Sequence, residues 1–171
     1  MHIVSSTRRL TAMALLAAVG VALFVIESYV PMPLPFLKVG LANISSVIAL
    51  LMLGPSAMVT VVVLRVVVGS LMVGSFMSPT FLLALAAGTS SAIAMAATKW
   101  GTGNLFSALG LSLIGSFTHV GVQILIVRFV YVQSAGVLHL LPLLFVTALV
   151  GGVVVGGISL RLLKALKEIR V

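Results

Sequence analysis

Residues 56–73 read SAMVTVVVLRVVVGSLMV, a run in which Arg65 is the single charged residue. Such a run is typical of a transmembrane helix, because about 20 mostly apolar residues span the hydrocarbon core of a bilayer. Similar runs recur along the whole chain, which is 61% hydrophobic and only 7% charged. A soluble domain usually carries about 25% charged residues. The sequence therefore predicts an integral membrane protein, since water would not tolerate so much apolar surface.

Prolines, glycines and polar residues divide the chain into six apolar segments. We expect transmembrane helices over residues 10–29, 36–53, 56–73, 80–98, 105–129 and 140–163. The apolar runs are continuous, whereas the strands of a membrane β-barrel alternate between apolar and polar residues. The predicted fold is all-α: a compact, polytopic bundle of six transmembrane helices that forms a single integral membrane domain over residues 1–171.

Basic residues flank the first and last apolar segments. Arg8 and Arg9 precede the first, and Arg161, Lys164, Lys167 and Arg170 follow or end the last. Cytoplasmic loops of membrane proteins carry an excess of Lys and Arg. Six spans place both termini on one side, so we expect both termini in the cytoplasm. We interpret the net charge of +8 as a topology signal, because the basic residues flank the membrane spans. We therefore expect no nucleic-acid partner.

Several kinds of chemistry lack the residues they need. The chain has no Cys and no Asp, and its acidic residues are Glu27 and Glu168. Thiolate sites and carboxylate-rich Mg²⁺ or Ca²⁺ sites are thereby excluded. The sequence also lacks a phosphate-binding Gly-Lys-Ser/Thr loop and a serine nucleophile elbow. We expect no catalysis by this chain alone, no cofactor and no metal site.

Arg65 lies in the middle of an apolar span, and an ionisable side chain there indicates a functional site. Glu27, near the outer end of the first span, is the one acidic residue able to pair with it inside the membrane. A Glu27–Arg65 pair would fix helix packing. Alternatively, Arg65 faces a cavity open to the outside and contacts an anionic ligand. The sequence leaves both readings open.

Other polar residues cluster in the outer half of the predicted bundle. The candidate substrate-binding residues are Lys38, Asn43, Ser46, Arg65, Ser70, His119 and Gln123. Asn43 and Ser46 share one helix face, as do His119 and Gln123, because residues three or four apart are neighbours on a helix. They either make hydrogen bonds between helices or line a pocket that is biased toward anions.

Small residues recur every fourth position on three spans. They are Ala14, Ala18 and Ala22; Ala84, Gly88, Ala92 and Ala96; and Gly152 and Gly156. This spacing lets another helix approach closely. The stripes pack inside the bundle or dock a separate membrane protein, and the first stripe is the better candidate for docking.

One part of the sequence carries a family resemblance. Residues 31–43 read PMPLPFLKVGLAN, and Leu64-Arg65 and Gly69-Ser70-Leu71 follow. These motifs resemble the bacterial Gx transporter family, also labelled heptaprenyl diphosphate synthase component I. The resemblance covers about residues 10–163. That family is similar to the substrate-binding S components of energy-coupling factor (ECF) transporters.

The resemblance implies an S-component-like fold in a bacterial cytoplasmic membrane, with a pocket on the outer side. It also implies a transmembrane coupling subunit and two cytoplasmic ATPases as partners, with Ala14 and Ala18 contacting the coupling subunit and Ala22 extending that stripe. S components take vitamins, their precursors or metal ions, and the N-terminal His pattern of the metal-transporting kind is missing. Prenyl diphosphate synthases use Asp-rich motifs, which this chain lacks.

The leading interpretation is a substrate-binding membrane subunit that captures a small anionic molecule resembling a vitamin or an isoprenoid or quinone precursor. The alternatives are an accessory membrane subunit of heptaprenyl diphosphate or quinone biosynthesis, and a structural membrane scaffold. The sequence leaves open the substrate, the partner and the oligomeric state.

Overall fold

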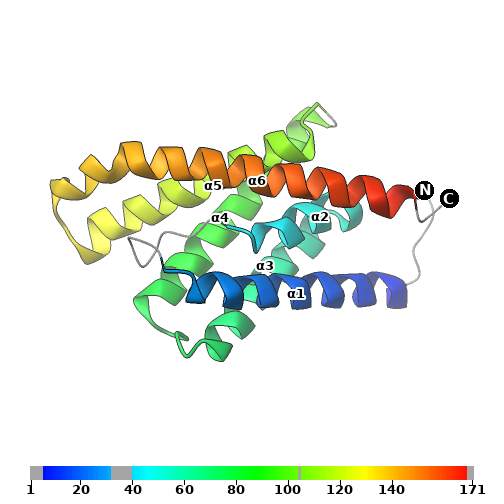
Figure 1. The fold of residues 1–171 in the computed structure, drawn as a ribbon, viewed down its shortest axis with the longest axis horizontal. Helices are drawn as coiled ribbons and strands as arrows, with labels where there is room; N and C mark the ends of the chain where they lie inside the picture. Colours follow the sequence, from blue (N-terminus) through cyan, green and yellow to red (C-terminus); the bar gives the residue numbers. More distant parts are fainter. Residues whose placement is uncertain (1–5, 32–39, 104, 169–171) are drawn as a thin grey trace.

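The computed structural model describes residues 6–31, 40–103 and 105–168. Its helices are α1 (Ser6–Tyr29), α2 (Asn43–Leu53), α3 (Pro55–Met72), α4 (Pro79–Thr102), α5 (Ala108–Ile126) and α6 (Leu141–Glu168) (Figure 1). A π-helical turn, η1 (Val127–Tyr131), extends α5, and a 3-10 helix, η2 (Ala135–Leu140), leads into α6. The described residues contain no strand, so the prediction of an all-α bundle of six helices is confirmed.

Five of these helices are long and apolar enough to cross a membrane: α1, α3, α4, α5 with η1, and α6 with part of η2. Their outer faces carry large apolar side chains, such as Leu15 and Ile93, each 63% exposed. An exposed apolar surface of this extent is unfavourable in water and natural against lipid. The fold is therefore that of a polytopic membrane protein.

Helix α2 is only 11 residues long. At 1.5 Å per residue it measures about 16 Å, roughly half the thickness of the hydrocarbon core. The expectation that the second span is helical from residue 36 is wrong for residues 40–42, which form a turn. Gly40 has a φ of +86°, a left-handed conformation that a right-handed helix does not contain, so the helix begins only at Asn43.

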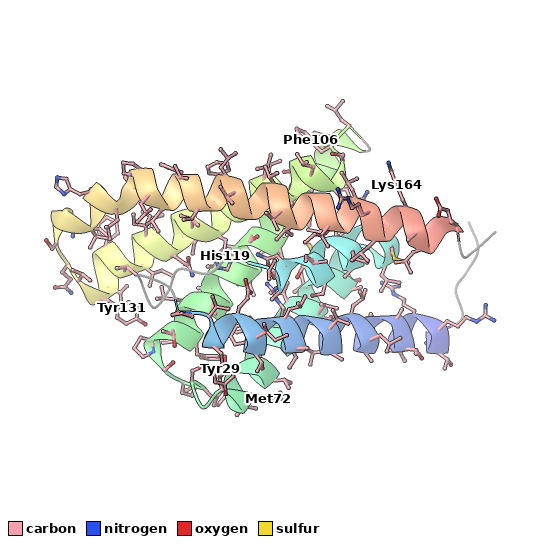
Figure 2. The ribbon with its side chains drawn as sticks, viewed as in Figure 1. Tyr29, Met72, Phe106, His119, Tyr131 and Lys164 are labelled. Atoms are coloured by element: carbon pink, nitrogen blue, oxygen red, sulfur yellow. The ribbon has the colours of Figure 1, made fainter. Side chains whose placement is uncertain are left out.

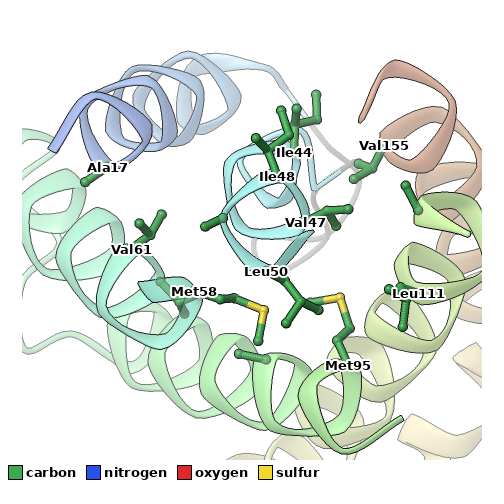
Figure 3. Close-up of a cluster of buried hydrophobic side chains, with 14 residues drawn as sticks. Ala17, Ile44, Val47, Ile48, Leu50, Met58, Val61, Met95, Leu111 and Val155 are labelled. Carbon is green, nitrogen blue, oxygen red and sulfur yellow. The ribbon is translucent and has the colours of Figure 1, made fainter. Parts of the chain in front are cut away.

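Helix α2 occupies the centre of the bundle, where it contacts α1, α3, α5 and α6 (Figure 3). Every residue of α2 from Ile44 to Leu50 is buried. Its Val47 and Leu50 belong to a core cluster with Met58 of α3 and Met95 of α4. The short helix is therefore shielded from lipid by the longer ones.

Glycines set how closely the outer helices pack. A Cβ atom added to Gly156 of α6 would lie 2.6 Å from the Cα atom of Leu109 in α5, and one added to Gly88 of α4 would lie 3.2 Å from Val62 of α3. These two stripes are thus used inside the bundle. In contrast, Ala14, Ala18 and Ala22 of α1 are all exposed.

The two ends of the bundle differ in what they carry. The start of α1, the end of α6 and the α2–α3 turn lie at one end, which we call the termini end (Figure 1). The α3–α4 and α5–α6 connections lie at the other, the far end. At the termini end the Arg9 Nη2 atom donates to the Leu53 carbonyl at 3.3 Å and to Ser56 Oγ at 3.0 Å. These bonds attach the start of α1 to the α2–α3 turn.

Candidate functional site

A cavity of about 290 Å³ lies in the half of the bundle toward the far end. It is bounded by the last turns of α1, the second half of α3, the start of α4, the second half of α5 and the first half of α6. Its polar lining residues are Glu27, Ser28, Asn43, Arg65, Ser75, Thr80, Ser116, His119, Gln123 and Thr147. The cavity exists because α2 is short: this helix fills the termini half of the bundle, and its first residues form the floor.

Glu27 of α1 holds the start of α2 in place. Its Oε1 atom accepts hydrogen bonds from the backbone N–H groups of Gly40 at 2.6 Å and Leu41 at 2.7 Å, and its Oε2 atom accepts one from Ala42 at 3.3 Å. Glu27 is only 6% exposed. These three N–H groups belong to the turn just before α2, where the partial positive charge at the start of a helix also favours a buried carboxylate.

Arg65 of α3 is buried beside this floor, with an exposed fraction of 3%. Its Nη2 atom donates to the Asn43 Oδ1 atom at 2.5 Å, while its Nε and Nη1 atoms have no hydrogen-bond partner. Glu27 attracts the guanidinium electrostatically, but the carboxylate oxygens bond to the backbone of residues 40–42. A buried cation that keeps unpaired N–H groups is costly and favours an additional acceptor.

Space for Arg65 is created by a glycine on the neighbouring helix α1. A Cβ atom added to Gly20 would lie 3.3 Å from the Cβ and Cδ atoms of Arg65 and 2.6 Å from Ser45 Oγ. Any side chain at this position would therefore displace the stem of Arg65 or the start of α2.

His119 and Gln123 line the cavity from successive turns of α5. Figure 2 shows His119 among the helices, between Tyr131 at the far end and Lys164 toward the termini end. Both His119 and Gln123 are already engaged in interactions. They contribute polar groups to the cavity wall that α5 forms.

Not all of the predicted site residues are seen to line the cavity. Ser46 and Ser70 do not line the cavity: both are fully buried, and their Oγ atoms have no hydrogen-bond partner. Lys38 lies outside the described residues. Arg128 is also away from the cavity, with its guanidinium carbon 5.3 Å from the centre of the Phe129 ring.

Hydroxyl groups that the sequence analysis did not single out also face the cavity. Thr80, Ser116 and Thr147 come from α4, α5 and α6 respectively. A lone hydroxyl in an apolar helix carries no sequence signal, because a Thr or Ser often bonds to its own helix. Thr147 does so, donating to the Leu144 carbonyl at 2.9 Å, and its oxygen keeps acceptor capacity toward the cavity.

The arrangement suits the binding of a small molecule. A concave, partly apolar site with a few convergent polar groups is the usual form of a ligand pocket. Among the described residues, no group of three or more His, Cys, Asp or Glu side chains is placed to hold a metal ion. The groups in the cavity are donors and acceptors for a ligand, with Arg65 as the strongest.

Comparison of the sequence with protein families gives a match to heptaprenyl diphosphate synthase component I over residues 16–162. The matched region begins within α1 and ends within α6, so it includes every segment that lines the cavity. No curated protein and no solved structure matches the chain.

Proposed function

The chain belongs to the heptaprenyl diphosphate synthase component I family, and from that premise we propose that it is the substrate-binding membrane subunit of an ECF-type transporter. In this role it captures a small anionic molecule from outside, of the kind represented by vitamins and by isoprenoid or quinone precursors. The observation that carries the proposal is the cavity with the incompletely paired Arg65 on its floor.

The position of the cavity supports capture from one side of the membrane. The core around α2 lies between the cavity and the termini end. Basic residues accumulate at the termini end, where Arg8 and Arg9 begin α1 and Arg161 and Lys164 lie in the last turns of α6. By the positive-inside rule this end is cytoplasmic and the cavity faces outward.

The proposed partners follow from what the chain lacks. The sequence has no phosphate-binding loop, so energy for transport has to come from other subunits. We propose a transmembrane coupling subunit and two cytoplasmic ATPases. The exposed stripe of Ala14, Ala18 and Ala22 on α1 offers a surface to the coupling subunit, because small residues let the backbones of two membrane helices approach closely.

Purification of the tagged chain from its native membranes tests the partner. Recovery together with an ATPase module supports the proposal. Recovery with a prenyl synthase, and never with an ATPase, would overturn it. The Ala18→Leu variant is a useful companion, because it fills the exposed stripe without touching the core and is expected to abolish recovery of the coupling subunit.

A second function is supported by the description of the family itself. An accessory membrane subunit of prenyl diphosphate synthesis would bind or deliver an isoprenoid substrate, while a separate protein would supply the Asp-rich Mg²⁺ site that this chain lacks. Mass spectrometry of small molecules that remain bound after purification separates both functions from a purely structural scaffold, which would carry none.

The ligand site is tested by alanine substitution of Asn43, Arg65 and His119, with binding measured by calorimetry on the purified protein. We expect each substitution to weaken binding of the molecule identified by mass spectrometry, with Arg65→Ala having the largest effect. Unchanged binding in all three variants would exclude the cavity as the binding site.

A further inference from the structure

We infer that the cavity takes a ligand with a single negative charge, a monocarboxylate with a short apolar body, rather than a diphosphate or another dianion. The inference rests on the proposed binding function and narrows it to one class of ligand. It follows from the charges and the lining of the cavity.

The described lining residues carry two fixed charges of opposite sign. Arg65 is the one residue there with a fixed positive charge, and Glu27 is the one with a negative charge. The Glu27 carboxylate keeps its charge, but its oxygens already accept three hydrogen bonds from the backbone N–H groups of the turn before α2. Arg65 donates to the neutral amide of Asn43, so its own charge is not matched by a bonded anion. Among the described lining residues, the Nε and Nη1 groups of Arg65 are therefore the charged donors still open to a ligand, and such a guanidinium fork matches the two oxygens of one carboxylate.

A ligand with more than one negative charge fits these described groups poorly. A monoanion at Arg65 gives a neutral pair, and buried charges are tolerated when they are paired and hydrogen-bonded. A second negative charge would meet no further fixed cation among the described lining residues, and the Glu27 carboxylate in the same cavity would repel it. The cavity therefore selects against extra negative charge.

The rest of the ligand would meet mainly apolar side chains. Apolar side chains cover much of the remaining wall, with Phe24 from α1, Val66 from α3, Leu83 from α4 and Val120 from α5. A volume of about 290 Å³ equals that of roughly ten water molecules in the liquid. The body of the ligand is accordingly apolar and short, with room for a hydroxyl near Ser116 or Thr147.

Four probes test this assignment in calorimetric titrations of the purified protein. Hexanoate, adipate and hexanamide share a six-carbon chain and differ in their charge, and isopentenyl diphosphate represents the diphosphates. We expect hexanoate to bind best, and adipate and hexanamide to bind more weakly by roughly tenfold or more, as is typical when a buried charge loses its match.

Variants assign the effect to Arg65. Arg65→Ala is expected to abolish the preference for hexanoate over hexanamide. Asn43→Asp provides a second route that keeps Arg65 in place, because its new carboxylate would lie against the guanidinium and compete with the ligand. Arg128→Ala removes a cation outside the cavity and is expected to change nothing.

The outcomes separate the inference from the proposed function. Tighter binding of isopentenyl diphosphate or adipate than of hexanoate would overturn the inference and leave an anion-binding subunit standing. A preference for hexanoate that survives in Asn43→Asp and in folded Arg65→Ala would overturn the assignment to Arg65. Binding of none of the four probes would overturn both the inference and the anion-binding role.

Discussion

Replacing Glu27 by alanine removes the acceptor for the three backbone N–H groups at Gly40, Leu41 and Ala42. Hydrogen bonds to a charged group contribute about 1.5–3 kcal/mol each, and a buried donor that loses its partner is costly to leave unpaired. The three bonds share one carboxylate and are not additive. We therefore expect a loss of about 4 kcal/mol in the free energy of unfolding, with the start of α2 affected most.

The assay is thermal unfolding of the purified protein in detergent. At the 2–4 °C per kcal/mol usual for chains of this length, a loss of about 4 kcal/mol lowers Tm by roughly 8–16 °C. Glu27→Gln keeps an oxygen that can accept from Gly40 and Leu41 but loses the charge and the bond to Ala42. Its expected cost is smaller, about 2 kcal/mol.

The chain supplies its own control, because Glu168 is its other acidic residue and is exposed at the end of α6. Glu168→Ala is expected to leave Tm within about 2 °C of the unmodified protein, since surface substitutions rarely change stability by more than about 0.5 kcal/mol. If Glu27→Ala behaved like Glu168→Ala, the carboxylate would not anchor α2 and the account of the cavity floor would be refuted.

Three further predictions use other features of the fold. Gly156→Ala is expected to destabilise the protein by about 1–3 kcal/mol, because the new methyl group meets the backbone of α5. The adjacent Gly157→Ala is the control: its methyl group meets nothing within 4 Å, so the variant is expected to be neutral or stabilising. Equal Tm values for the two variants would contradict this prediction. Because the chain has no Cys, a single introduced Cys is the one site that a maleimide can label. A Met77→Cys variant at the far end should react with a membrane-impermeant maleimide in intact cells, whereas Trp100→Cys should react only after permeabilisation. The reverse labelling pattern would invert the proposed topology. Ala18→Leu, on the exposed face of α1, should leave Tm unchanged while it prevents recovery of the coupling subunit; a large fall in Tm would instead place this stripe inside a packed interface.

Features that depend on local composition were predictable from the sequence. The six apolar segments, the all-α class and the unusual position of Arg65 follow from which residues stand where along the chain. Asn43, Arg65, His119 and Gln123, which are among the candidate residues named from the sequence, line the cavity, and their role in binding stays a prediction. Polar residues in an apolar span are rare enough to attract notice one by one, and burying them against lipid is costly.

The remaining features depend on contacts between distant segments, and only the tertiary structure decided them. The sequence offered Arg65 as the partner of Glu27, whereas the fold brings the turn before α2 close enough for the Glu27 oxygens to accept hydrogen bonds from its backbone. Ser46 shares a helix face with Asn43 in the sequence pattern, yet it is buried below the cavity. Backbone N–H groups carry no sequence signal, because every residue except proline has one.

The sequence alone determined that this chain is a bundle of apolar helices with one arginine in the middle of the third span. The tertiary structure decided that the second helix is half as long as the bilayer core and lies at the centre of the bundle. The short length of α2 creates the cavity, because the space beyond the start of this helix is left for a ligand. The physical reason is that Gly40, with its positive φ, keeps the helix from extending back through residue 40, and Glu27, 13 residues earlier in the chain, accepts hydrogen bonds from the turn that leads into α2.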